Sequence, residues 1–339
     1  MKIDYLISSD SKLFGLADVI DMLQGANELA QVFGVEKSPF EVSIVGTDKK
    51  PIGFNGNVTI LPDKTIRDSK PSDTIIIPAF EKGDYKGYIE KNGQTIEWLK
   101  SQHKEERTLI GLCSGSFLIA ATGLLNGKNC TTHWVGKSIF QELFPEVKLE
   151  TQYILVKEEG ILTSGGSTNA LYAILYLIHQ HFGRTIAQHI AKLYELELGR
   201  FTQSQFEIFM PNKTHQDTEI LNAQLYIENN FATIGSIDEV STTSKLGKRQ
   251  FFRRFKETTF DTPFKYLQKT RIEAAKNKLE STNLTISEIA FQVGYGEISS
   301  FRKVFKDLTG IPPDEYRKKN HLDYWKKVIL EKNTTANKS

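Results

Sequence analysis

The chain has 339 residues, with 43 Lys and Arg against 41 Asp and Glu, a net charge of +2. Two cysteines in this length exclude a fold built on disulfides, and the very apolar stretch at 170–178 is too short to span a bilayer. The first residues also lack the pattern of a signal peptide, so we expect a cytoplasmic protein without a membrane span.

Short β-rich runs alternate with helical patterns over residues 1–200. Strands are predicted at 3–8, 41–45, 74–77, 108–112, 153–156 and 161–164, and helices at 17–34, 94–102, 115–125, 135–143 and 167–182. This order predicts a doubly wound, flavodoxin-like α/β domain. About 200 residues are ample for a hydrophobic core of its own.

A distinctive motif in this half is Gly111-Leu112-Cys113-Ser114-Gly115, which follows a predicted strand and opens a predicted helix. Small residues around a central nucleophile permit the strained strand-to-helix turn that exposes a side chain at the edge of a sheet. A thiol at a helix N-terminus is also favoured as thiolate. A lone cysteine is, however, more often an inert core residue.

Two further motifs extend this pattern: Thr131-Thr132-His133-Trp134, and the run at 160–167 that ends in Gly165-Gly166-Ser167. Together the three motifs resemble the class I glutamine amidotransferase-like superfamily, in its PfpI-like branch, over most of residues 1–200. The resemblance implies that Cys113 and His133 occupy the positions of a catalytic pair, in which neutral imidazole accepts the thiol proton. His133 can also be read as a hydrogen-bonded wall residue.

The chain departs from the branch at two catalytic positions. Gly15 stands near the place of the acidic partner of the cysteine, with Asp18 and Asp21 nearby, and residues 78–80 read Pro-Ala-Phe in place of a glycine-rich oxyanion turn. We therefore expect no enzymatic turnover. The favoured interpretation is a pocket for a small effector, lined by Ala79, Phe80, Cys113, Ser114 and His133.

Three alternatives to the effector pocket stay open. The first is a PfpI-like cysteine hydrolase or a glyoxalase-like enzyme, and the second is a thiol redox sensor that uses Cys113. The third is inherited geometry without a role. His179, His181 and His189 do not fit the spacing of a metal site, so no metal or cofactor is predicted.

The remaining boundaries follow from changes in periodicity. Residues 201–218 become polar and lose both periodicities, which predicts a linker between a domain at 1–200 and a second domain at 219–320. The tail at 321–339 is polar toward its end, and we expect it to be disordered.

The second domain carries the same helical pattern twice, about fifty residues apart. Ile237, Glu239, Val240, Phe251, Phe255, Lys256, Pro263 and Tyr266 recur as Ile286, Glu288, Ile289, Phe301, Phe305, Lys306, Pro313 and Tyr316. The offset is 49 residues before the turn and 50 after it, which a turn of different length would explain. Each copy therefore predicts a helix, a short turn and a second helix.

The signals at the ends of these helices are clear in the second copy. Thr285 or Ser287 can cap the first helix, Gly294 can end it in the left-handed conformation, and Ser299 or Ser300 can open the second helix. The second helix of each copy has an apolar face and a basic outer face. The outer cations are Lys248, Arg249, Arg253, Arg254 and Lys256 in the first copy and Arg302, Lys303 and Lys306 in the second.

A basic helix face is commonly only a solvated surface, but the repetition and the charge distribution favour nucleic-acid binding. Residues 231–320 hold 17 Lys and Arg against 11 Asp and Glu, a net +6, whereas residues 1–230 hold 22 against 28, a net −6. A second helix turned sharply against the first is the geometry that enters a major groove.

The residues of this half resemble the DNA-binding domain of the AraC/XylS family of transcription regulators over about 222–320. The second copy carries the more specific match, in ISEIAFQVGY at 286–295, SFRKVFK at 300–306 and TGIPP at 309–313. In the first copy Phe260 stands at the position of Gly310, where the family usually has glycine, and Ser241 replaces a usual alanine. Phe260 is therefore expected either to adopt a positive φ or to pack in the core.

The resemblance, with the PfpI-like half, implies a sequence-specific transcription regulator that binds double-stranded DNA, forms a homodimer and contacts RNA polymerase. An interaction protein that happens to carry helix-turn-helix units is the rival interpretation. The residues expected to contact DNA are Lys248, Arg249, Gln250, Arg253, Arg254, Glu297, Ser299, Ser300, Arg302, Lys303 and Lys306. The sequence does not separate base readers from phosphate anchors among them.

Overall fold

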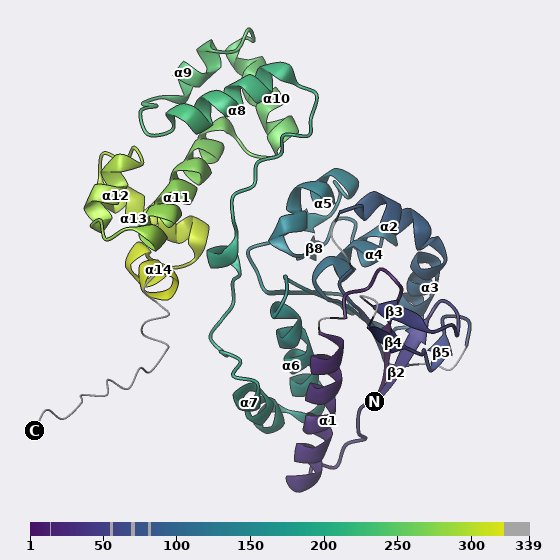
Figure 1. The fold of residues 1–339 in the computed structure, drawn as a ribbon. Coiled ribbons are helices and arrows are strands. Elements are labelled where there is room, and N and C mark those ends of the chain that lie inside the picture. The colour runs from purple at the N-terminus through teal and green to yellow at the C-terminus, as the bar shows by residue number, and fades with distance from the viewer. Residues whose placement is uncertain (14, 55–56, 69–71, 81–82, 322–339) are drawn as a thin grey trace, which may run out of the picture. The chain divides into compact units, whose positions relative to one another are not determined.

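A computed structural model describes residues 1–321 apart from 14, 55–56, 69–71 and 81–82, so most of the expected tail lies outside the described residues. The chain divides into two compact units, which meet in the sequence between Gln203 and Ser204 (Figure 1). The first three residues of the expected linker, 201–203, thus belong to the first unit. Each unit is described by itself below.

The first unit is built on a seven-stranded sheet in the order β10-β11-β7-β6-β1-β2-β5. Its strands are β1 (Lys2–Leu6), β2 (Glu41–Gly46), β5 (Lys64–Thr65), β6 (Thr74–Ile77), β7 (Thr108–Gly111), β10 (Leu155–Glu158) and β11 (Ile161–Ser164). All neighbours in it are parallel except β10 and β11. Two small pairs lie outside it, β3 (Ile52–Phe54) with β4 (Val58–Ile60) and β8 (Asn129–Cys130) with β9 (Lys148–Leu149).

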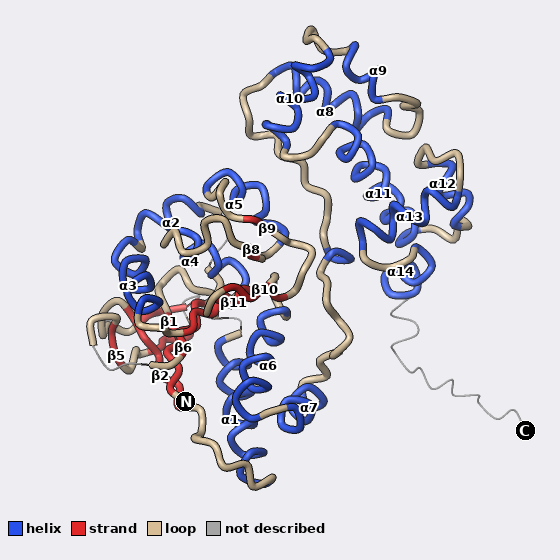
Figure 2. The backbone as a smooth tube through the Cα atoms, turned by 180° about the vertical axis from the view of Figure 1, so that it is seen from behind, coloured by secondary structure: helices blue, strands red, loops and turns tan. Residues whose placement is uncertain are grey.

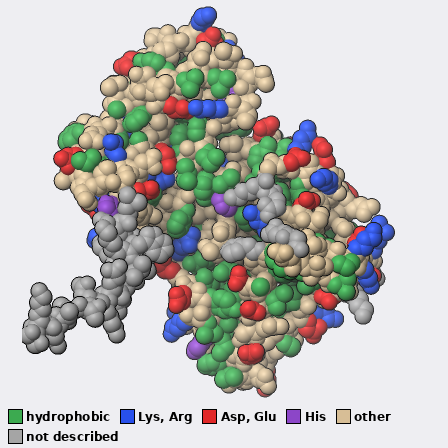
Figure 3. Space-filling view, viewed as in Figure 1, with side chains coloured by type: hydrophobic (Ala, Val, Ile, Leu, Met, Phe, Trp, Pro, Cys, Tyr) green, Lys and Arg blue, Asp and Glu red, His purple; other side chains and the backbone are tan. Residues whose placement is uncertain are grey.

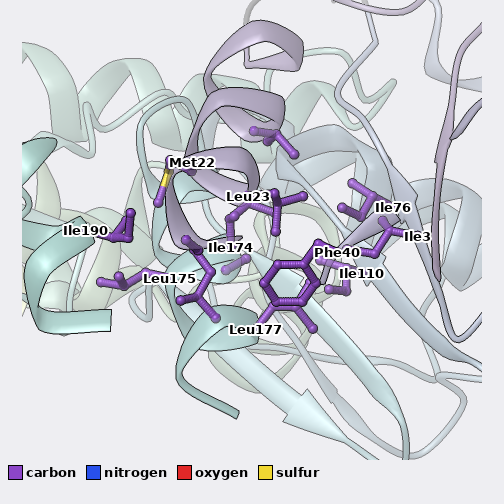
Figure 4. Packing of buried hydrophobic residues seen from close by; sticks show 14 of the residues in the cluster. Ile3, Met22, Leu23, Phe40, Ile76, Ile110, Ile174, Leu175, Leu177 and Ile190 are labelled. Carbon is purple, nitrogen blue, oxygen red and sulfur yellow. The ribbon is translucent and has the colours of Figure 1, made fainter. Parts of the chain in front are cut away.

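Helices cover both faces of this sheet. Helices α1 (Leu16–Val32), α6 (Asn169–Phe182) and α7 (Arg184–Leu193) share one apolar cluster with Ile76 and Ile110 (Figure 4). The neighbouring strand residues Ile75 and Leu109 pack on the other face. That face is covered by α2 (Tyr85–Lys91), α3 (Gly93–Lys104), α4 (Ser116–Ala121) and α5 (Lys137–Leu143). Alternating strand residues therefore serve two cores, as a doubly wound sheet requires.

The edge of the sheet departs from a uniform parallel order. Glu158 pairs with Ile161 across an antiparallel hairpin, so Glu159 and Gly160 form a two-residue turn. Both have positive φ, 40° and 78°, which is the type I′ geometry that such hairpins favour. β10 is thereby fixed at Leu155–Glu158, two residues beyond its predicted start. The short strands β3–β5, β8 and β9 and the helices α2 and α7 were not predicted.

The second unit contains helices and no strand among its described residues (Figure 2). Its helices are α8 (Thr218–Asn230), α9 (Ile237–Thr242), α10 (Lys248–Thr259), α11 (Pro263–Ser281), α12 (Ile286–Gln292), α13 (Ile298–Thr309) and α14 (Pro313–Asn320). One apolar cluster holds α8, α9, α10 and the start of α11, and another holds the rest of α11 with α12, α13 and α14. Both helix pairs thus pack on α11.

The two helix pairs repeat each other in detail. Thr259 Oγ1 contacts the carbonyls of Phe255 and Asp261, and Thr309 Oγ1 makes the same contacts with Phe305 and Ile311. The turns 243–247 and 293–297 have equal length and α12 is one residue longer than α9, so the extra residue of the second copy lies where the first helix passes into the turn.

Candidate functional site

The outer face of α10 carries the expected cations of the first helix-turn-helix unit. Lys248, Arg249, Gln250 and Arg253 are exposed, with Lys248 2.8 Å from Asp238 and Arg253 3.2 Å from Glu257. Such exposed pairs contribute little to stability and exchange readily for other partners. This face is therefore open to a polyanion.

Arg254 differs from its neighbours because its guanidinium is engaged within the protein. Nε and Nη2 donate to the two carboxylate oxygens of Asp217 at 2.9 and 2.6 Å. Asp217 also caps α8 by accepting from the N–H of Ile220. A bidentate pair of this kind fixes α10 against the start of α8. The pKa of Arg254 is raised chiefly by this hydrogen bond.

The outer face of α13 repeats the arrangement. Helix α13 begins at Ile298 with Glu297 as its N-cap residue, earlier than predicted, so Ser299 and Ser300, which were expected to open the helix, lie inside its first turn. Arg302 pairs with Asp314, and Lys303 and Lys306 are exposed. On the face shown in Figure 3, Lys and Arg side chains are interspersed with Asp and Glu. Among the described residues on this side of the molecule, the positive charge therefore lies on single helix faces and does not form one continuous basic surface.

Helix α12, the first helix of the second helix-turn-helix pair, is strongly defined. Thr285 and Glu288 form a reciprocal capping box, which selects Thr285 over Ser287 as the N-cap. Gly294 follows with φ of 88°, and a Cβ there would lie 2.6 Å from the carbonyl oxygen of Ala232. Glycine is required at this turn for both reasons, of which the sequence predicted the first, the left-handed conformation.

The first unit, separately, contains a cavity of about 210 Å³ at the carboxyl ends of its strands. All five residues of the expected pocket line it, namely Ala79, Phe80, Cys113, Ser114 and His133. Six others that the sequence analysis did not assign to the pocket join them: Tyr5, Lys12, Gly15, Leu112, Ser167 and Ala170. Leu112 and Ser167 stand in the motifs at 111–115 and 160–167, and Gly15 is the position that lacks a carboxylate. Tyr5, Lys12 and Ala170 come from the end of β1, the segment before α1 and the start of α6.

Cys113 has the strained elbow geometry that its motif indicates. Its φ is 55°, and it opens the 3₁₀ turn η1 (Cys113–Gly115) that leads into α4. A Cβ on Gly115 would lie 2.3 Å from the carbonyl oxygen of Ile77, so the turn requires glycine there. The strain and the close approach hold the thiol beside the cavity.

Several catalytic parts are nevertheless missing or occupied. Gly15 lines the cavity without a carboxylate, and Asp18 and Asp21 are not among its lining residues. The pKa of Tyr194 is raised chiefly by burial and further by the charges of these two aspartates. The N–H of Phe80, in the segment that replaces the oxyanion turn, donates to Ser114 Oγ at 2.9 Å. An N–H that is already paired offers little to a developing oxyanion.

His133 is held in an orientation that disfavours a role as general base. Its Nδ1 accepts from the N–H of Val135 at 3.1 Å, so the neutral ring carries its proton on Nε2. That tautomer donates from Nε2 and cannot take a thiol proton there. A Cβ on Gly166 would lie 1.8 Å from the imidazole Cδ2, so the ring is closely packed. His133 thus fits the role of a hydrogen-bond donor in the cavity wall.

Other sites are few among the described residues. No group of three His, Cys, Asp or Glu side chains in this part of the chain could hold a metal ion. No described helix is long and apolar enough to cross a membrane. Cys130 is fully buried, and burial raises the pKa of its thiol to about 12.

Comparison with known families divides the chain in the same way as its fold. Residues 20–180 match the DJ-1/PfpI family, and residues 240–319 match a helix-turn-helix domain family. The HTH-type transcriptional regulator GbdR of Pseudomonas aeruginosa is 25% identical over 317 residues, which cover 93% of this chain and 83% of GbdR.

Two further relatives concern parts of the chain. The isonitrile hydratase of Pseudomonas putida is 28% identical over 149 residues, 44% of this chain and 62% of that enzyme. A solved structure from Vibrio parahaemolyticus, described as a candidate transcriptional regulator, matches 57% of this chain and 97% of its own with a TM-score of 0.50. At 18% identity this likeness shows a shared fold.

Proposed function

The chain belongs to the AraC-type helix-turn-helix regulators with an N-terminal DJ-1/PfpI domain, and on this premise we propose that its first domain binds a small effector that controls DNA binding by the second. The observation that carries the effector proposal is the cavity beside Cys113, in which a nucleophile elbow persists while its acid, base and oxyanion partners are lost or engaged. A ligand alters DNA binding only if it binds two arrangements of the chain with different affinity.

In the second domain we propose that α10 and α13 enter successive major grooves on one face of the DNA, about 34 Å apart. The proposed contacts are the exposed residues of the two faces: Lys248, Arg249, Gln250 and Arg253 on the first, and Glu297, Ser299, Ser300, Arg302, Lys303 and Lys306 on or beside the second. Arg254 is given a structural role instead, because its guanidinium is bound to Asp217.

The partners follow from the same premise. We propose that the protein works in the cytoplasm as a homodimer and contacts RNA polymerase at its promoters. Sedimentation of the purified protein that showed only monomer at working concentrations would contradict the dimer.

The DNA proposal is tested by operator binding in gel-shift titrations at several salt concentrations, after genome-wide footprinting has identified an operator. Arg253→Ala and Arg302→Ala are each expected to weaken operator binding about tenfold if they contact bases, or to reduce the salt slope by about one if they contact phosphates. Lys192→Ala, which removes an exposed cation from the first domain, is the matched control. Unchanged affinity in both arginine variants would show that these helix faces are misassigned.

An enzyme remains a second candidate because of the similarity to isonitrile hydratase and the Cys113 elbow. A cysteine hydrolase or glyoxalase-like enzyme would lose its turnover in Cys113→Ser, whereas the regulator proposed here keeps operator binding in that variant. The engaged N–H of Phe80 and the tautomer of His133 favour the regulator.

A further inference from the structure

Gln203 is the last residue of the first domain, and its side chain is only 1% exposed. Its backbone N–H donates to the carbonyl of Gln152 at 2.9 Å, and the preceding Thr202 forms a bridge with Tyr153. A polar side chain buried this deeply at the start of a linker requires an explanation.

The carboxamide of Gln203 joins three separate segments of the first domain. Nε2 donates to the carbonyls of Thr132 at 2.9 Å and Thr151 at 2.7 Å. Oε1 accepts from the N–H of Gly166 at 3.1 Å and from Nδ2 of Asn169 at 3.2 Å. Only an amide both donates and accepts in this way, so a carboxylate or an aliphatic side chain would break at least half of the network.

Two of these segments carry residues of the cavity wall. Thr132 directly precedes His133, and Gly166 directly precedes Ser167. The contacts leave no free space, because a Cβ on Gly165 would lie 2.6 Å from the Gln203 amide. A shift of His133 or Ser167 therefore displaces the hydrogen-bond partners of Gln203.

A second anchor holds the linker on the DNA-binding domain. Lys276 of α11 is 4% exposed, and its Nζ donates to the carbonyl of Glu207 at 2.6 Å and to the carboxylate of Glu273 at 2.9 Å. Glu273 also accepts from the N–H of Phe209 at 3.1 Å. The linker is thus bound to the helix on which both helix-turn-helix units pack.

Only Ser204–Phe206, the 3₁₀ turn η3, separate Gln203 from Glu207. We propose that Gln203 and Lys276 are the positioning residues that transmit occupancy of the cavity to α11: displaced wall segments shift Gln203, and the short connection passes this shift to the carbonyl held by Lys276. The inference rests on the proposed function, because it requires an occupant of the cavity to alter DNA binding. Three residues have fewer free backbone dihedrals to absorb such a shift than a long flexible linker has.

The test uses a permanent occupant of the cavity, since its natural ligand is unidentified. Cys113→Gln extends a longer side chain from the elbow that borders His133 and Ser167. The measured quantity is the ratio of operator Kd with and without this substitution, taken in full-length protein. We expect a ratio that differs from one by at least threefold in the parent chain, and a ratio close to one in Gln203→Leu and in Lys276→Met.

Matched controls separate transmission from folding. Gln152→Ala removes an exposed neighbour of Gln203, and Lys278→Met removes another lysine of α11; both are expected to keep the parent ratio. Thermal unfolding identifies any variant that fails to fold, and the other anchor then serves as the test. Hydrogen exchange provides a second measurement: Cys113→Gln should change the exchange of residues 204–209 in the parent but not in Gln203→Leu.

The two possible failures are distinct. A ratio of one in the parent chain overturns the effector proposal and the inference with it. A parent ratio of threefold or more that persists in a folded Gln203→Leu or Lys276→Met protein overturns the inference alone, and the cavity still controls DNA binding by another route.

Discussion

Phe260 and Gly310 hold equivalent places in the two helix-turn-helix units, and both adopt a left-handed backbone, with φ of 62° and 82°. Each ends the second helix of its unit, and each N–H bonds to the lysine carbonyl four residues earlier. Phe260 is 37% exposed, so it does not act as the core residue that would have avoided a positive φ. The first helix-turn-helix unit therefore has the same turn as the second, but with a side chain at the left-handed position.

Replacing Phe260 by glycine and by alanine isolates the strain of this backbone. Both changes remove the ring, so the difference between them reports the conformation alone, and Phe260→Gly is expected to be more stable than Phe260→Ala by about 1 kcal/mol. At Lys256, inside α10, the order should reverse by about 1 kcal/mol because glycine weakens a helix interior. Urea unfolding of the four variants, followed by circular dichroism, makes the comparison. Equal stability of the two Phe260 variants would contradict the strain.

Features set by neighbouring residues could be predicted from the sequence, whereas contacts between residues far apart in the chain could not. The capping signal at Thr285 and the glycine at position 294 are local, and the structure confirms both. The network of Gln203 joins residues as far as 71 positions away in the chain, and no periodicity marks it. Strand β10 was predicted, but its antiparallel direction was not, because that direction depends on a two-residue turn at Glu159 and Gly160.

The ion pair between Asp217 and Arg254 should make the DNA-binding domain sensitive to acid. Burial acts to raise the pKa of Asp217, but the hydrogen bonds from Arg254 and the N–H of Ile220 outweigh it and lower the pKa below its ordinary value of 3.8. A carboxyl with a lowered folded pKa stabilises the fold above pH 3.8 and loses this contribution as the pH falls through the folded pKa.

Asp217→Asn keeps a good helix N-cap and removes the charge. It is expected to lower the unfolding temperature at pH 7 and to have progressively less effect as the pH falls below 3.8. Asp238→Asn is the control, because its pair with Lys248 is exposed and should contribute little at any pH. If Asp217→Asn lowered the unfolding temperature by the same amount at pH 7 and at pH 3, the charge of Asp217 would be excluded as the cause.

The glycine pair at 165–166 is expected to be intolerant of side chains for a steric reason. A Cβ on Gly166 would lie 1.8 Å from the His133 ring, which is itself held by Val135, so the ring or the loop must shift. Gly166→Ala should cost about 1–3 kcal/mol of stability, as overpacking typically does. Gly199→Ala is the matched control, since nothing lies within 4 Å of a Cβ there. Calorimetry of both variants tests this, and equal unfolding temperatures would contradict the contact.

The two cysteines should differ in their reaction with a small alkylating reagent. Only the thiolate reacts, and burial raises the pKa of Cys130 to about 12, which leaves almost no thiolate at pH 8. Cys113 is 8% exposed and lines the cavity, whereas Cys130 is fully buried. Iodoacetamide is therefore expected to label Cys113 first and Cys130 at least about a hundredfold more slowly, with both labelled in strong urea.

Mass spectrometry of the digested protein measures the two rates, and Cys113→Ser should remain unlabelled in the native state. Equal rates would refute the burial of Cys130, and labelling of neither residue would show that the cavity does not admit even a small molecule.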